Sequence, residues 1–429
     1  MKAGFGRAEL TPPMGVELAG YGYYLGRRAL SVRDPLYARV LALEEGGACY
    51  LLISCDVLGL SRPVCGEVFA HAEELGIPAG HVLIVSIHTH TGPAIIYHEG
   101  CGYVDDAYVA TVAPAICRAA DAALEDLREV RSLRFAALPF EGDHIYNRTI
   151  PGGPVDRTVR GFLFSRADGE PIAAVSAACH GVFRGRVTAV SADFGGEICR
   201  RLDGMGLRTV YLNGLCGDID PTEQSDELLD SCASLVVDHF SALLGEASDP
   251  LPKGVSGLPL TLSGGSLPLT LSGGSLPFTL RLMPVTREDI RQAARQAVER
   301  AGGPEEPAAR VAFIWEKEML ERFDTLSEQE PISVKYLLIG GVPVLALPFE
   351  GFTAIGQEIR ARCGRPDALV LGCAEQLLGY LPTRDDISRG TYAALESTFL
   401  YKRLPVVPGE AERLGETIGK AMAEILAMA

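Results

Sequence analysis

The stretch Val82–Pro93 reads V-L-I-V-S-I-H-T-H-T-G-P. Its first half is a short run of branched apolar residues, which is typical of a buried β-strand at 82–87. Its second half is a polar loop with two histidines, His88 and His90, two positions apart. Ligands and catalytic groups usually lie in loops at the carboxyl ends of such strands. The stretch therefore predicts a strand that delivers a chemically active loop.

Strand and helix patterns alternate on both sides of this stretch. Further strands are predicted at 172–179, ending in His180, at 209–212 and at 369–371. Residues 333–347 read as two strands around Gly340-Gly341, a hairpin signal, and run directly into Glu350. Helices are predicted at 105–127, where Pro114 should start or kink the helix, at 352–362, and at 410–428. The fold class is therefore α/β, with a mixed β-sheet core flanked by helices.

Composition excludes some classes of partner and suggests a compartment. The net charge is −16 and the pI is about 5.0, with no basic cluster, so we expect no nucleic-acid partner. The N-terminus lacks a signal-peptide pattern, and no run of about 18 apolar residues predicts a transmembrane segment. Eleven cysteines without a C-x-x-C pair fit reduced thiols, so we expect a cytoplasmic protein.

The polar residues at the strand ends each fit two roles when taken alone. In an extended chain His88 and His90 face the same side, so they form either part of a zinc site or a histidine pair in a turn. His180 is either a hydrogen-bonded core histidine or a ligand. Glu350 is a ligand, a helix-capping neighbour or a surface charge.

Ten motifs, taken together, resemble the neutral/alkaline (non-lysosomal) ceramidase family. In chain order they are G-R-A-E-L-T-P-P (6–13), L-A-G-Y-G (18–22), D-P-L-Y-A-R (34–39), V-S-I-H-T-H-T-G-P (85–93), Y-N-R-T (146–149), A-C-H-G-V (178–182), S-A-D-F (191–194), G-D-I-D-P (217–221), L-P-F-E (347–350) and G-Y-L-P-T (379–383). They span nearly the whole chain in order. The resemblance implies a fold like the catalytic domain of neutral ceramidases.

The resemblance also implies a zinc ion and a set of site residues. The metal ligands are His88, His180, Glu350 and Tyr380. His90 is implied as a hydrogen-bonding or proton-transfer group, Arg148 as an arginine near the scissile group, and Tyr380 as a catalytic donor as well as a ligand. Because ligating histidines usually bond a further partner, Asp56, Asp193 and Asp218 are candidates for that role, or else turn and cap residues.

Two features depart from the family. The family's functional serine is replaced by Gly214 in N-G-L-C-G-D, and the neighbouring Cys216 is either a nucleophile or a buried structural thiol. No strand-rich tail follows residue 404, so we expect no C-terminal β-sandwich domain. A nine-residue repeat, L-P-L-T-L-S-G-G-S twice and then L-P-F-T-L, occupies 258–280 and predicts an exposed loop or extra hairpin.

Because the implied ligands lie on both sides of the repeat, we expect one catalytic domain, 1–429, with an insertion or linker at 251–283. The expected function is a zinc-dependent hydrolase that cleaves an amide (N-acyl) bond with metal-activated water. Its substrate would be a small-molecule amide or a lipid-like compound. The alternatives are a non-catalytic metal- or ligand-binding homologue and a true ceramidase with a rebuilt pocket.

Overall fold

A computed structural model describes residues 1–241 and 267–428, and within them two β-sheets stack between two layers of helices. The larger sheet has eight strands in the order β11-β9-β8-β6-β1-β3-β4-β5. They are β1 (Lys2–Glu9), β3 (Tyr37–Glu45), β4 (Ala48–Cys55), β5 (Val82–Ser86), β6 (Arg128–Pro139), β8 (Thr158–Arg166), β9 (Ile172–Ala177) and β11 (Arg208–Asn213). The smaller has the order β13-β14-β15-β17, from β13 (Leu271–Arg281), β14 (Gln329–Ile339), β15 (Val342–Ala346) and β17 (Leu369–Leu371).

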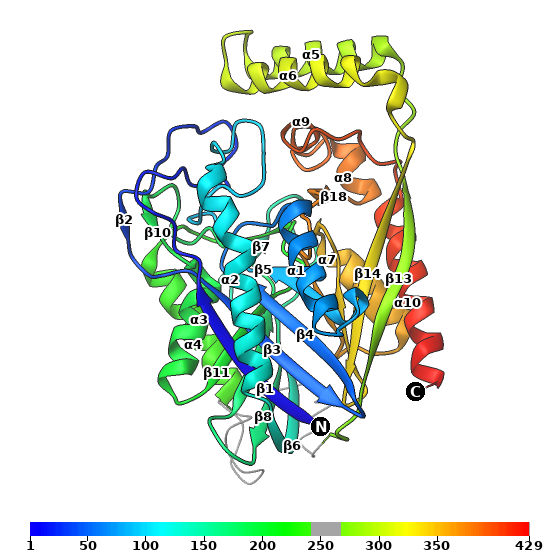
Figure 1. The fold of residues 1–429 in the computed structure, drawn as a ribbon. Helices are drawn as coiled ribbons and strands as arrows, with labels where there is room; N and C mark the ends of the chain where they lie inside the picture. Colours follow the sequence, from blue (N-terminus) through cyan, green and yellow to red (C-terminus); the bar gives the residue numbers. More distant parts are fainter. Residues whose placement is uncertain (242–266, 429) are drawn as a thin grey trace.

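Short ladders and helices complete the described chain (Figure 1). Three two-stranded ladders pair β2 (Ser31–Val32) with β10 (Ala189–Val190), β7 (Ile145–Asn147) with β12 (Ile219–Pro221), and β16 (Glu350–Gly351) with β18 (Tyr380–Leu381). The helices are α1 (Arg62–Glu74), α2 (Asp106–Glu125), α3 (Asp193–Gly204), α4 (Asp226–Ser241), α5 (Arg287–Ala301), α6 (Pro307–Glu321), α7 (Thr353–Cys363), α8 (Arg384–Arg389), α9 (Glu396–Leu400) and α10 (Glu410–Met428), with 3₁₀ turns η1 (Ala79–His81) and η2 (Phe323–Thr325).

Both faces of the larger sheet are buried, which explains why its strands read as continuous apolar runs. Along β3, Val40 and Ala42 join a core with α1 to α4, whereas Leu41 and Leu43 point into a second core shared with the smaller sheet. This is the alternation of side chains that a strand imposes. A third core lies between the smaller sheet and the helices α7 and α10. The predicted α/β class with a mixed sheet is confirmed, and the second sheet adds a layer to it.

The predicted elements differ from the structure in two places. Helix α2 begins at Asp106 and runs through Pro114, so the predicted alternative in which this proline starts a helix is wrong. The second copy of the repeat and the segment after it were predicted as a loop or extra hairpin in an insertion at 251–283. Residues 271–281 instead form β13, which pairs with β14 along its whole length. Phe278 and Leu280 of this strand are buried, so its apolar residues serve as core. The first copy, 258–266, lies outside the described residues.

Helix α2 is the one described helix long and apolar enough to cross a membrane. It lies across β1, and its apolar residues pack on the larger sheet (Figure 1). Two glycines of β1 permit a close approach, since a Cβ on Gly4 would lie 2.0 Å from Ala123 O and one on Gly6 would lie 1.9 Å from Ala119 O. The apolar residues of α2 are thus accounted for by packing within the fold.

Replacing Gly6 with Ala should lower the free energy of unfolding by about 3 kcal/mol, because the new methyl group would overlap the backbone of α2. Urea denaturation followed by circular dichroism measures this. Gly66→Ala in α1 is the matched control, since its Cβ would meet nothing within 4 Å. That control should stabilise the protein by about 0.5–1 kcal/mol. Equal stabilities for the two variants would contradict the packing described here.

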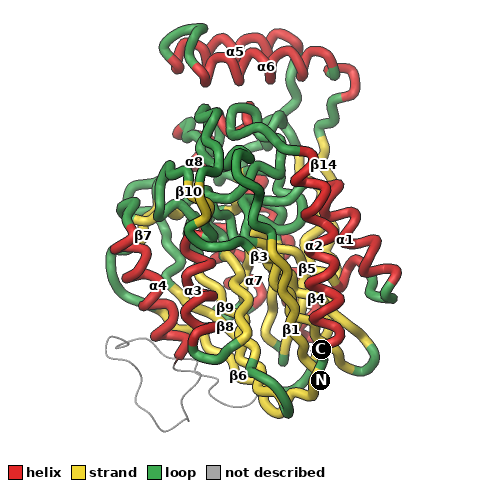
Figure 2. Tube along the Cα trace, turned by 60° about the vertical axis from the view of Figure 1, so that its left-hand side comes forward, coloured by secondary structure: helices red, strands yellow, loops and turns green. Residues whose placement is uncertain are grey.

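Helices α5 and α6 form a pair that stands beyond the end of the sheets, carried by β13 and β14 (Figure 1). The loops that connect the sheet strands gather between this pair and the sheets (Figure 2). Trp315 of α6 packs edge-on against Phe399 of α9 and donates its Nε1 hydrogen to Arg403 O at 3.0 Å. The helix pair is therefore packed against the C-terminal loops through a small core of its own.

Candidate metal centre

His88 and His180 follow the strands β5 and β9, as the sequence predicted. His88 has a φ of +62°, a conformation that residues with a side chain rarely adopt. Its N–H donates to Val57 O at 3.0 Å, and its Nδ1 lies 2.8 Å from Leu58 O. Held backbone strain of this kind clusters at functional sites.

The loops that carry His90 and His180 lie directly against each other. His90 N donates to Gly181 O at 2.9 Å. A Cβ on Gly181 would lie 2.7 Å from His88 O, so the glycine after His180 permits this contact. Gly20, at a φ of +108°, similarly makes room for the His90 ring, since its Cβ would lie 2.5 Å from the ring. Three histidines from two loops therefore meet at one point.

Glu350 and Tyr380 come from the β16–β18 ladder, in which they are paired directly in a parallel register. Glu350 N also donates to Gly379 O at 2.9 Å. Thirty residues separate the two side chains in the sequence, yet the ladder places their backbones next to each other. This ladder is the feature that adds a carboxylate and a phenol to the histidines.

The side chains of the three histidines form a buried cluster. The ligand atoms of His88, His90 and His180 all lie within 4.8 Å of one another. Oε2 of Glu350 lies 3.2 Å from Nε2 of His88 and 3.2 Å from Nε2 of His180. Each of these side chains is at most 7% exposed, so water competes little for the donor atoms.

The hydrogen bonds indicate which nitrogens carry lone pairs. Nδ1 of His88 lies 2.8 Å from Leu58 O and Nδ1 of His180 lies 3.1 Å from Ile219 O, so each Nδ1 is the donor. His180 Nε2 lies between a donor and an acceptor, 3.3 Å from Arg148 Nη2 and 3.2 Å from Glu350 Oε2. When these imidazoles are neutral, with Nδ1 as the donor, both Nε2 atoms turn lone pairs toward the Glu350 carboxylate.

This arrangement of acceptors fits a cation. Two imidazole lone pairs and a carboxylate oxygen repel one another unless positive charge lies among them. His88 Nε2 is buried and lacks a hydrogen bond, as do both ring nitrogens of His90. Burial opposes protonation of His88, but the charge of Glu350 outweighs it and raises the pKa of His88 to about 9. Imidazole and carboxylate ligands suit a divalent ion such as zinc, so the residues present fit the metal implied by the sequence motifs.

His90 has a different electrostatic environment from His88. Burial, together with the charges on His88 and His180, holds the pKa of His90 well below its ordinary value. His90 is therefore a neutral imidazole with two free nitrogens. That state suits either a proton-transfer group or a further metal ligand.

Arg148 is fixed at the edge of the cluster. Its Nε and Nη2 donate to Gly217 O at 3.2 and 3.0 Å, and Nη2 also donates to Tyr380 Oη at 2.8 Å. Asp220 Oδ1 lies 3.5 Å from Nη1. Burial opposes the charge, but Tyr380, Asp220 and Glu350 raise the pKa of Arg148, so the guanidinium stays charged.

Two contacts of the cluster had no local signal in the sequence. Tyr401 donates a hydrogen bond to Oε1 of Glu350, although it lies 51 residues further along the chain. Asp220 Oδ1 lies 3.6 Å from His180 Nδ1.

Asp56, Asp193 and Asp218, the acidic partners considered from the sequence, do not contact the histidines. Asp56 accepts from Tyr37 N, and Asp193 accepts from the backbone of residues 183, 184 and 194. Asp218 accepts from Thr353 N at 2.9 Å. Each satisfies backbone donors, so the turn and cap interpretation is correct. Backbone carbonyls take the place of these carboxylates beside the histidines.

Gly214, at the position of the family's serine, is closely packed. A Cβ there would lie 2.8 Å from Ala178 Cβ. The neighbouring Cys216 is fully buried. A hydrogen bond from Cys373 lowers the pKa of Cys216 to about 6, and the thiol packs in a small apolar cluster with Cys373 and Leu377. This supports the structural interpretation of the thiol.

Gly214→Ser should therefore lower the free energy of unfolding by about 1–3 kcal/mol, because Ala178 must move to admit the side chain. Thermal and urea denaturation measure the change. The variant should gain no cleavage of short-chain ceramide over the unmodified protein. A serine variant of unchanged stability that cleaves ceramide would show that the position can be rebuilt.

The fold is similar to that of solved ceramidases. Neutral ceramidase from Pseudomonas aeruginosa matches with a TM-score of 0.72 at 14% sequence identity, over 100% of this chain and 74% of that one. A structure described as a ceramidase complexed with C2 matches with a TM-score of 0.72 at 14% identity, over 100% of this chain and 75% of that one. No family model and no curated protein matches the sequence. The fold implied by the sequence motifs, that of a neutral-ceramidase catalytic domain, is confirmed.

Proposed function

We propose that this chain, with its neutral-ceramidase fold, is a zinc-dependent hydrolase that cleaves the amide bond of an N-acyl compound. The observation that carries the proposal is the convergence of His88 Nε2, His180 Nε2 and Glu350 Oε2 in a buried site. Tyr380, paired with Glu350 in the β16–β18 ladder, is the fourth proposed ligand. Zinc held by such a set supplies Lewis acidity and a water molecule of lowered pKa.

The remaining side chains supply donors and a proton carrier. Arg148 is held on Gly217 O and presents its Nη2 beside Tyr380 Oη, so both groups can donate toward the oxygen of the scissile carbonyl. Such fixed donors stabilise the negative charge that develops there. His90 is neutral, so it can accept a proton from the attacking water and return it to the departing amine nitrogen.

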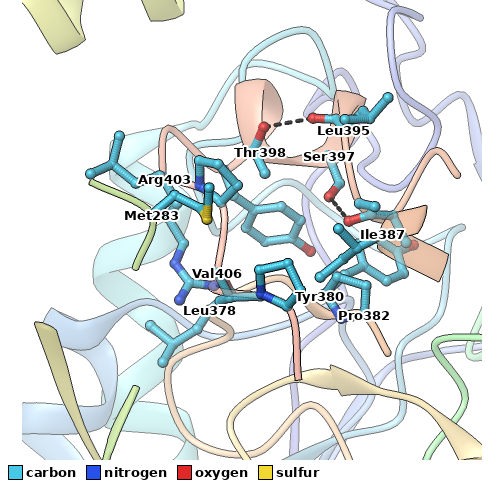
Figure 3. A pocket seen from close by; sticks show the side chains of 16 residues that line it. Met283, Leu378, Tyr380, Pro382, Ile387, Leu395, Ser397, Thr398, Arg403 and Val406 are labelled. Atoms are coloured by element: carbon cyan, nitrogen blue, oxygen red, sulfur yellow. Dashed lines mark hydrogen bonds between the residues drawn. The ribbon is translucent and has the colours of Figure 1, made fainter. Parts of the chain in front are cut away.

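A largely apolar cavity of about 220 Å³ lies beside Tyr380, and Figure 3 shows the side chains that line it. Tyr380 and Tyr401 belong to its wall, and Leu378, Ile387 and Val406 supply apolar side chains. A dry cavity of about 150 Å³ accommodates benzene, so this one has room for an apolar group somewhat larger than that ring. It supports a substrate with a medium-length acyl chain beside the amide.

The proposal is tested with fluorogenic N-acyl amides of increasing acyl length and with fluorescent short-chain ceramide. We expect kcat/KM for an octanoyl amide to exceed that for the acetyl amide by about 10-fold or more, since each buried methylene contributes about 0.8 kcal/mol. A chelator should abolish turnover and added zinc should restore it. Metal binding without turnover of any amide would favour the non-catalytic homologue, whereas ceramide cleavage would favour a true ceramidase with a rebuilt pocket.

His90→Gln should separate proton transfer from metal binding. We expect the variant to keep its zinc while kcat falls by about 100-fold or more, the usual contribution of a positioned acid–base group. Elemental analysis and steady-state kinetics on the same preparation measure both. Loss of the metal would instead assign His90 to the ligand set, which its place in the three-histidine cluster also allows.

A further inference from the structure

Tyr401 contacts the Glu350 carboxylate on the side away from the histidines. Its hydroxyl donates to Oε1, whereas His88 and His180 both face Oε2. An ionised carboxylate can only accept, so the direction of the bond is fixed. The two oxygens of Glu350 thus have separate partners.

The ring of Tyr401 is held from several sides. The His98 ring packs edge-on against it with 4.1 Å between centroids. Gly379, at a φ of +91°, borders the ring so closely that a Cβ there would lie 2.8 Å from Cγ. Gly379 O also accepts the Glu350 N–H. One glycine therefore fixes the backbone of Glu350 and the place of the ring that contacts its side chain.

We propose that Tyr401 is a positioning residue of the metal centre, whose hydroxyl fixes the Glu350 carboxylate so that Oε2 is presented to His88 and His180. This inference rests on the metal site of the proposed function. The terminal torsion of a glutamate is broad, so without this bond only the contacts of Oε2 with His88 and His180 would orient the carboxylate. Hydrogen bonds to metal-ligating groups typically change metal affinity by about 10–100-fold.

Two parts of Tyr401 have separate roles. Its ring lines the apolar cavity, while its hydroxyl serves the carboxylate. Tyr401→Phe keeps the ring and removes the hydroxyl. The substitution therefore isolates the effect on Glu350.

The test is the zinc affinity of the full-length protein, measured by competition with a chromophoric chelator. We expect Tyr401→Phe to bind zinc about 10–100-fold more weakly than the unmodified protein. Tyr108→Phe is the matched control. Tyr108 lies on helix α2, and its buried hydroxyl also donates to a single oxygen, Leu10 O, at 2.5 Å. The control variant should lose stability without losing zinc affinity.

An affinity of Tyr401→Phe within twofold of the unmodified protein would overturn the inference, and so would an equal loss in Tyr108→Phe. A merely structural role would change the unfolding midpoint of the metal-free protein in both variants and leave zinc affinity alone. If the unmodified protein itself binds no zinc, the proposed function fails first. The two failures are therefore distinguishable.

Discussion

Glu350→Gln should yield a folded protein without bound metal, against about one zinc per chain in the unmodified protein. The carboxylate is the negative group that both imidazoles face, and the amide that replaces it keeps the shape but not the charge. Mutation of a group that only hydrogen-bonds a metal ligand typically weakens metal binding by about 10–100-fold, so removal of the ligand itself should weaken zinc binding by more. Elemental analysis after dialysis measures the result, and His88→Ala should behave in the same way.

The control for this experiment is His71→Asn. His71 forms a similar pair with a carboxylate, since its Nε2 lies 2.7 Å from Asp121 Oδ1, but it lies on α1 away from the cluster. This variant should keep its zinc. A Glu350→Gln protein that retains one metal ion would show that His88, His90 and His180 suffice, and it would remove the carboxylate from the ligand set.

Arg148→Lys should lower kcat by about 100–1,000-fold while zinc content stays unchanged. This is the usual effect of removing one donor that stabilises developing negative charge. The guanidinium bonds Gly217 O and Tyr380 Oη at once, and a single ammonium group cannot reproduce that fork. Kinetics with the octanoyl amide and metal analysis on the same sample measure both quantities.

Arg157→Lys is the matched substitution outside the cluster. Arg157 also donates to backbone carbonyls, those of Gly142 and Ile145. Its replacement should change kcat less than threefold. If Arg148→Lys retains kcat within the same range, Arg148 has a structural role, and Tyr380 and His90 remain as the candidates for stabilising the transition state.

The sequence predicted which strands precede His88 and His180, but it did not predict how the segments of the centre come together. Runs of branched apolar residues located β5 and β9, so the loops with His88 and His180 were expected to carry function. Nothing local indicated that Glu350 and Tyr380 share a ladder, because two-residue strands have no periodicity. Their grouping came from the resemblance alone. The partners of the histidine Nδ1 atoms were missed because carbonyls such as Leu58 O leave no mark in the side-chain pattern.

The sequence also could not predict that the fold contains a second sheet. A strand buried on both faces reads the same whether helices or a second sheet cover it, so β3 and β4 could not reveal the layer beneath them. The Gly340-Gly341 turn did predict the β14–β15 hairpin, and both glycines have positive φ. The assignment of His88, His180, Glu350 and Tyr380 as zinc ligands stays a prediction until metal is measured.

The nine-residue repeat allows two pairing registers between β13 and β14. Strand β13 begins within one copy of L-P-L-T-L-S-G-G-S, and an identical copy precedes it, so a slip of nine residues against β14 would offer nearly the same side chains. Within the paired segment the slip would exchange Phe278 for Leu and Arg281 for Ser. Phe278 is buried, and Arg281 bonds Glu410 of α10 through its backbone and its side chain. These two residues therefore select one register from two, and a duplicated stretch of chain remains compatible with a single native structure.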